Sequence, residues 1–152
     1  HERDFLTVGS MGHANMIALG MAKARPDAAF WCVDGDGAAM MHLGGLAIEA
    51  QQRATNLIHV LLNNGAHESV GGMPVAGGTL RFAPIAEAAG YELALTAETD
   101  GELTEALQTL RAAPGKLRFL EIIVSCGARD DLGRPTQTPK ENLQSLMQAL
   151  GK

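Results

Sequence analysis

An aspartate stands between two glycines at the point where a short apolar run meets a helical pattern. The stretch reads Gly35-Asp36-Gly37 and follows the apolar residues 30–33. Ligands of open α/β sheets bind at the carboxyl ends of the strands, and free N–H groups at helix N-termini bind phosphates. A carboxylate would repel a phosphate unless a divalent cation lay between them, and Mg²⁺ prefers oxygen ligands. The stretch therefore predicts a metal–diphosphate site or, alternatively, a plain turn with Asp36 as the helix N-cap.

A second polar stretch, Asn63-Asn64-Gly65, follows the apolar run at residues 57–62. Residues 38–62 separate it from Gly37, which is enough for one helix and one strand, so both loops are expected at the same end of the sheet. The side-chain oxygen of Asn64 and the backbone carbonyl of Ala66 would join the Asp36 carboxylate around one cation. Diphosphate oxygens and water would complete an octahedral Mg²⁺ site. Taken alone, the asparagine pair could equally be a turn that ends a strand.

The elements that must position these loops can be read from the hydrophobic pattern. Apolar runs predict strands at residues 30–33, 57–62, 91–96 and 117–124. Helical patterns alternate with them, at residues 14–24, 39–52 and 83–89, and capping boxes at Thr99 and Thr138 open two more helices. The alternation predicts an α/β fold: an open, mostly parallel sheet with helices on both faces. The aperiodic segments 63–80 and 125–138 are expected to be functional loops.

Composition narrows the class of protein. The chain has 152 residues and a net charge of −5, so we expect one domain and no basic patch for a nucleic acid. The apolar runs are too short to span a bilayer, and no signal peptide is evident, which favours a cytoplasmic location. Cys32 and Cys126 lie in apolar stretches and are expected to be buried reduced thiols. Trp31 and His59 are expected in the core.

The spacing of Gly35-Asp36-Gly37 and Asn63-Asn64 resembles the signature of thiamine-diphosphate enzymes. The resemblance implies that Asp36, Asn64 and the Ala66 carbonyl hold Mg²⁺. It implies a further set of cofactor contacts at Gly9, Ser10, Met11, Gly35, Gly37 and Ala38. In these enzymes the backbone after the aspartate holds the diphosphate, the carbonyl at the position of Gly9 meets the aminopyrimidine, and the residue at the position of Met11 supports the bent cofactor. Without the resemblance, Gly9–Gly12 could be a turn with Met11 in the core.

Three longer stretches resemble phosphonopyruvate decarboxylases: VGSMGHANMIALGMA, NNGAHESVGGMPVAGG and ARDDLGRPTQTPKEN. Sulfopyruvate decarboxylases share the first glycine-rich stretch and the GDG region. The resemblance implies a carboxy-lyase that acts on a 2-oxo acid, most specifically on phosphonopyruvate to give phosphonoacetaldehyde and CO₂. Residues 1–152 would be one diphosphate-binding domain. The catalytic glutamate would come from a pyrimidine-binding domain or subunit that is absent from this chain, which makes a homo- or hetero-oligomer the expected assembly.

Two histidines beside these motifs, His13 and His67, are the candidate catalytic residues, for substrate contact or proton transfer. Alternatively, His13 caps a helix and His67 bonds the loop backbone. For the substrate's anionic tail, the further candidates are Arg129, Arg134 and the amides of Gly71 and Gly72. The two arginines could instead form surface ion pairs with Asp131, and His42 is expected to be structural. Two other classes of protein remain open: a non-catalytic Mg²⁺–nucleotide module and a structural domain with turning glycine loops.

Overall fold

A computed structural model describes residues 2–75 and 80–151 of the chain. It divides into two compact units. The smaller unit comprises the described residues of His1–Met11 and Gly127–Lys152, and the larger unit is Gly12–Cys126. Asp36, Asn64 and Ala66 therefore belong to one unit, whereas Gly9, Ser10 and Met11 belong to the other.

The larger unit contains a four-stranded sheet in the order β1-β2-β6-β5, and all three strand pairs are parallel. The strands are β1 (Phe30–Gly35), β2 (Leu57–Asn63), β5 (Leu93–Ala97) and β6 (Arg118–Ile123). A separate antiparallel pair, β3 (Ala66–His67) and β4 (Met73–Pro74), lies in the segment predicted to be irregular. The last part of that segment, residues 76–79, lies outside the described residues.

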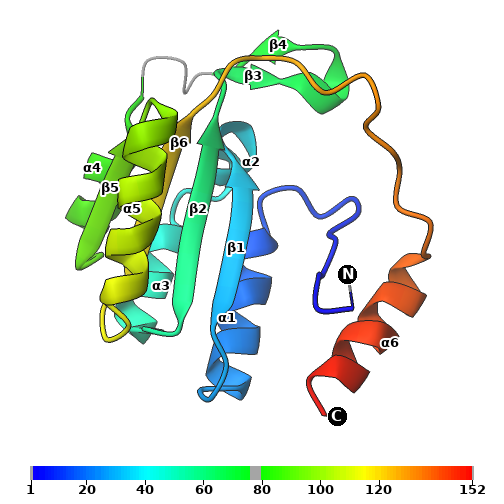
Figure 1. The fold of residues 1–152 in the computed structure, drawn as a ribbon, viewed down its shortest axis with the longest axis horizontal. Helices are drawn as coiled ribbons and strands as arrows, with labels where there is room; N and C mark the ends of the chain where they lie inside the picture. The colour runs from blue at the N-terminus through cyan, green and yellow to red at the C-terminus, as the bar shows by residue number, and fades with distance from the viewer. Residues whose placement is uncertain (1, 76–79, 152) are drawn as a thin grey trace. The chain divides into compact units, whose positions relative to one another are not determined.

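Helices cover both faces of this sheet, as predicted. They are α1 (Ala14–Ala24), α2 (Asp36–Met41), α3 (Gly45–Gln52), α4 (Phe82–Ala89) and α5 (Asp100–Ala112), with a short 3₁₀ helix, η1 (Glu68–Val70). Figure 1 shows α5 in front of the sheet and α1 and α3 behind it. On the α5 side, Ile58, Val60 and Leu120 pack against Ala106 and Leu110. Residues 57–61 of the central strand β2 are all buried, which explains why the run LIHVLL hardly alternates.

The prediction of one helix over residues 39–52 is wrong. Helix α2 already begins at Asp36, and α3 begins only at Gly45. The adjacent glycines Gly44 and Gly45 weaken helix formation at the break. Asp36 is not the N-cap either, because Gly35 takes that place and α2 has no side-chain cap.

Two residues expected to be buried are exposed. Trp31 on β1 keeps 42% of its surface accessible. It faces the same side of the sheet as Ile58, but α5 packs mainly on β5 and β6. Cys126 follows β6 and is also exposed, whereas Cys32 is buried as expected.

In the smaller unit, α6 (Pro139–Ala149) is tied to the N-terminal segment by the buried side chain of Asn142. Its amide nitrogen donates to the Asp4 carbonyl at 2.7 Å, and its oxygen accepts from the Leu6 N–H at 2.9 Å. Across both units, no described helix combines the length and the apolarity needed to cross a bilayer.

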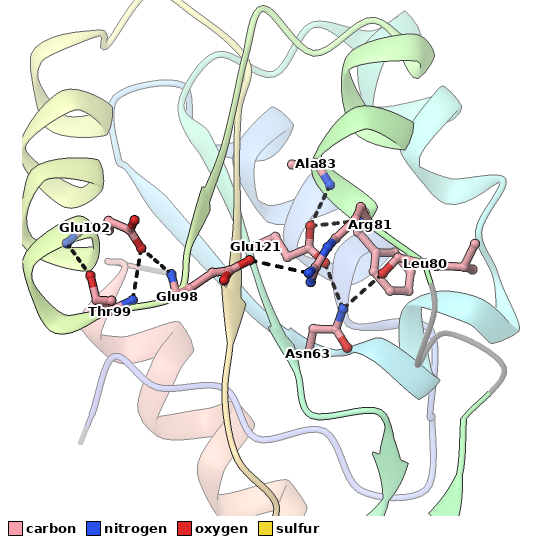
Figure 2. Close-up of polar contacts among 9 residues, drawn as sticks. Asn63, Leu80, Arg81, Ala83, Glu98, Thr99, Glu102 and Glu121 are labelled. Atoms are coloured by element: carbon pink, nitrogen blue, oxygen red, sulfur yellow. Dashed lines mark hydrogen bonds and ion pairs between the residues drawn. The ribbon is translucent and has the colours of Figure 1, made fainter.

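Both predicted capping boxes are confirmed, at Thr99 for α5 and at Thr138 for α6. The Thr99 side chain accepts from the Glu102 N–H, and the Glu102 carboxylate accepts from the Thr99 N–H at 3.0 Å (Figure 2). Each box satisfies backbone donors that the first helical turn leaves without partners.

Replacing Thr99 with alanine should lower the free energy of unfolding by about 1 kcal/mol, because the Glu102 N–H loses its acceptor. Urea denaturation measures the change. Thr104→Ala is the matched control on the same helix, since its hydroxyl only donates to the Asp100 carbonyl and its loss should cost less than about 0.5 kcal/mol. Equal effects of the two substitutions would contradict the capping role.

Candidate cofactor and metal site

The two glycine-flanked loops meet at the Asp36 carboxylate, which is 2% exposed. One oxygen, Oδ1, accepts from the Gly37 N–H at 2.8 Å. The other, Oδ2, accepts from the Gly65 N–H at 2.8 Å, so a residue after β1 is bonded to the loop after β2. The expectation that both loops lie at one end of the sheet is confirmed, because β1 and β2 are neighbouring parallel strands.

The oxygen atoms around this contact suit a hard cation. The Asn64 side-chain oxygen accepts from the Ala66 N–H at 3.0 Å, and a carbonyl or carboxylate oxygen has a second lone pair to offer. Among residues 2–75 and 80–151, no three His, Cys, Asp or Glu side chains gather as a metal cluster. An ion here would therefore combine the Asp36 carboxylate with amide, carbonyl and ligand oxygens, which is a donor set that fits Mg²⁺. Ligation by Asp36, Asn64 and Ala66 stays a prediction.

His67 lies directly against the start of α2. A Cβ atom built on Gly37 would lie 2.3 Å from the Cε1 atom of the His67 ring, so only glycine leaves room for this histidine. The ring is half-buried and belongs to the short strand β3. The structure thus brings His67 together with the Gly35-Asp36-Gly37 turn, where the cofactor is predicted to bind.

The His13 ring lies beside the ring of His42, a residue that was expected to be structural. The rings of His13 and His42 are 4.3 Å apart, and both residues are exposed. Gly12 has a positive φ of 83°, and a Cβ there would lie 2.4 Å from His42 Nδ1. His13 is the N-cap residue of α1, as the capping alternative expected, but its side chain makes no capping hydrogen bond. No sequence signal pointed to this contact, because residues 39–52 were predicted to form one helix, whereas His42 follows the end of α2.

Near the end of β2, the buried carboxylate of Glu121 holds the Asn63 side chain (Figure 2). Glu121 Oε1 accepts from the Asn63 side-chain amide at 2.8 Å. Its Oε2 accepts from the N–H groups of Phe82 and Ala83, in the first turn of α4, at 2.9 and 3.0 Å. Sequence reasoning missed this residue, although a glutamate inside the apolar run FLEIIV was a signal that it needs buried partners.

A second buried cluster lies between β1, β2 and α3. His59 is completely buried, as predicted, with Nε2 3.7 Å from Asp34 Oδ2 and Nδ1 3.4 Å from Glu49 Oε2. The Tyr91 hydroxyl donates a hydrogen bond to Glu49. Burial by itself lowers the pKa of His59, but the two carboxylates facing its nitrogens outweigh burial and raise the pKa to about 9. His59 is therefore an imidazolium at neutral pH.

Other predicted contacts are engaged elsewhere or lie in the smaller unit. The amides of Gly71 and Gly72 donate to the carbonyls of Glu68 and His67, so these N–H groups already have acceptors. Arg129 forms an exposed ion pair with Asp131 at 3.2 Å, which is the surface alternative considered for it. Arg134 is exposed. The cofactor contacts proposed for Gly9, Ser10 and Met11, and the catalytic roles of His13 and His67, stay predictions.

Residues 2–122 match the model of one protein family, described as "Thiamine pyrophosphate enzyme, C-terminal TPP binding domain". The chain belongs to this family. The sequence is 35% identical over 140 residues to the phosphonopyruvate decarboxylase of Streptomyces viridochromogenes, covering 92% of this chain and 35% of that protein. It is 36% identical over 91 residues to the sulfopyruvate decarboxylase subunit beta of Methanothermobacter thermautotrophicus, covering 60% and 49%.

A solved structure supports the same fold for this thiamine pyrophosphate family member. The 4-hydroxybenzoylformate decarboxylase of Rhodococcus jostii superposes with a TM-score of 0.63 at 23% identity, covering 76% of this chain and 23% of that one. The resemblance stated from the motifs and the predicted α/β fold are both confirmed. The chain spans about a third of the length of the phosphonopyruvate decarboxylase that it matches.

Stability should fall at alkaline pH because of His59. Its pKa is about 9 in the folded chain against 6.5 for an ordinary histidine, so its stabilising contribution is complete below pH 6.5 and is lost as the pH rises through 9. The free energy of unfolding should drop by up to about 3 kcal/mol over that range. Urea midpoints at a series of pH values measure it. His42→Gln should keep the drop and His59→Gln should abolish it; a drop that persists in His59→Gln would assign it to another group.

Proposed function

We propose that this chain binds thiamine diphosphate and Mg²⁺ as one half of a decarboxylase acting on a 2-oxo acid. Within this class, the substrate that we propose is phosphonopyruvate, which would be converted to phosphonoacetaldehyde and CO₂. The observation that carries the proposal is the 2.8 Å hydrogen bond from Gly65 to Asp36. It joins the two loops whose oxygen atoms would have to surround one cation.

Each part of the cofactor has candidate residues in this chain. Asp36, Asn64 and the Ala66 carbonyl would hold Mg²⁺, and the backbone of Gly37 and Ala38 would bind the diphosphate beside the turn made by Gly35. Gly9, Ser10 and Met11 would contact the rest of the cofactor. The close packing of His67 on Gly37 supports this arrangement. Because Gly37 has no side chain, another group can come close to its backbone, as the His67 ring does.

When bound, thiamine diphosphate supplies the electron sink that the loss of CO₂ from a 2-oxo acid requires. The chain's own contribution would be to bind and orient the substrate and to move protons. His13 and His67 are the candidates for these tasks, since imidazoles exchange protons near neutral pH and can bind an anion when protonated. His42 adds a second imidazole beside His13, with a ring separation of 4.3 Å.

The active site would be completed by a pyrimidine-binding domain or subunit that carries the catalytic glutamate. The partial coverage of the phosphonopyruvate decarboxylases supports this view, since about two thirds of their length has no counterpart in this chain. One observation favours a second candidate function, a sulfopyruvate decarboxylase beta-type subunit. Two similar proteins are named as that subunit, and about half of the length of each is matched.

Titration calorimetry with the chain should show thiamine diphosphate binding that requires Mg²⁺ and is not matched by ATP. Asp36→Asn should weaken the binding at least tenfold, because the cation loses a charged ligand. Asp131→Asn, which alters an exposed carboxylate in the smaller unit, is the control and should bind like the unchanged chain. Equal affinity for ATP would instead favour a nucleotide-binding module, and no binding of either would favour a structural domain.

The purified chain should show no measurable decarboxylation of phosphonopyruvate or sulfopyruvate, because the glutamate that activates the cofactor would lie on the partner domain. Release of CO₂ measures this directly. Activity should appear when a pyrimidine-binding domain from a phosphonopyruvate or sulfopyruvate decarboxylase is added, and the preferred substrate would then separate the two candidate functions. Turnover by the chain alone would overturn the assignment of the missing half.

A further inference from the structure

The buried cluster of Asp34, Glu49 and His59 has no part in the proposed chemistry, yet Asp34 lies on β1 only two residues before Asp36. All three side chains are at least nine-tenths buried. Among the described residues, neither nitrogen of His59 has a hydrogen-bond partner, and the same holds for Asp34 Oδ2 and Glu49 Oε1. The two nitrogens of His59 instead form ion pairs, at 3.7 Å with Asp34 Oδ2 and at 3.4 Å with Glu49 Oε2. Breaking a buried ion pair is costly, but apolar side chains of similar volume are often as stable as the whole pair, so stability alone does not explain why charges stand here.

The cluster is connected to Asp36 by a short chain of contacts. His59 faces Asp34 Oδ2, and the other oxygen of Asp34 accepts from the Gly35 N–H at 3.0 Å. Gly35 is the N-cap of α2, and Asp36 is the first residue of that helix. The ion pair thus restrains the Asp34 side chain, and the Asp34 side chain restrains the backbone that leads into the proposed metal ligand.

Strand β2 and the loop that follows it contact both Asp34 and Asp36. His59 lies within β2, whereas Gly65, which donates to Asp36 Oδ2, lies just beyond the end of β2. On the far side of His59, Glu49 belongs to α3 and accepts the Tyr91 hydroxyl. The cluster therefore links β1, β2 and α3 with Tyr91, which lies two residues after α4.

We propose that His59 is a positioning residue, which acts through Asp34 to hold the Asp36 carboxylate in place for Mg²⁺. The inference rests on the proposed function and deepens it. Metal ligands must be held within about 0.5 Å of a productive geometry, and groups behind the ligands usually provide that restraint. Without the imidazolium, two buried carboxylates would face each other and Asp34 would lose the charge that orients it.

The test compares His59→Gln with Arg118→Met at a temperature where both variants are folded. Arg118 is also buried, and it donates to the carbonyls of Leu110 and Thr55, away from the turn. The first readout is hydrogen exchange of the Gly37 and Gly65 amides without any ligand. We expect at least tenfold faster exchange in His59→Gln, relative to amides of the β2–β6 pair, and a change below twofold in Arg118→Met.

The second readout is the affinity for thiamine diphosphate with Mg²⁺, which should fall at least tenfold in His59→Gln and less than twofold in Arg118→Met. If His59→Gln does not fold, Tyr91→Phe removes only the hydroxyl that restrains Glu49, and it should shift both readouts about threefold in the same direction. Unchanged amide exchange, unchanged affinity, or equal effects of Arg118→Met would overturn the positioning role. Failure of the unchanged chain to bind would refute the proposed function alone, because the exchange readout needs no ligand.

Discussion

The hydrogen bond from the Gly65 amide to the Asp36 carboxylate is the contact on which the site depends. It crosses between two loops that are separated in the sequence by a helix pair and a strand, and it involves a side chain that is almost fully buried. A buried carboxylate requires partners for its lone pairs. Here the partners are backbone amides of both loops, so the negative charge itself brings the loops together.

Around that contact, the sheet carries charged groups that a simple α/β core would not contain. Glu121 ties the end of β2 to the first turn of α4, and His59 lies between Asp34 and Glu49. Both clusters lie on the side of the sheet covered by α1, α3 and α4. The α5 side is mostly apolar, and the buried charge of Arg118 there donates to the Leu110 carbonyl. The polar side of the core is therefore the side that supports the loops, which links the composition of the interior to the geometry of the proposed cofactor site.

Much of the fold could be predicted from the sequence because it depends on local signals. Capping boxes place the starts of α5 and α6, and the non-alternating runs at β2 and β6 reveal strands covered on both faces. The predictions that failed concern tertiary coverage. Trp31 lies in a good strand pattern, but only the extent of α5 decides whether its face of β1 is covered. The break between α2 and α3 was missed because the apolar pattern continues through it.

The sequence by itself determined the family, and it predicted the oxygen-bearing residues of the proposed site, since residue type and spacing along two neighbouring strands carry that information. Only the tertiary structure decided that His42 lies beside His13, that His67 packs on Gly37 and that His59 is held between two carboxylates. The reason is physical: these contacts join residues from different elements, and their distances depend on how strands and helices pack rather than on any local pattern.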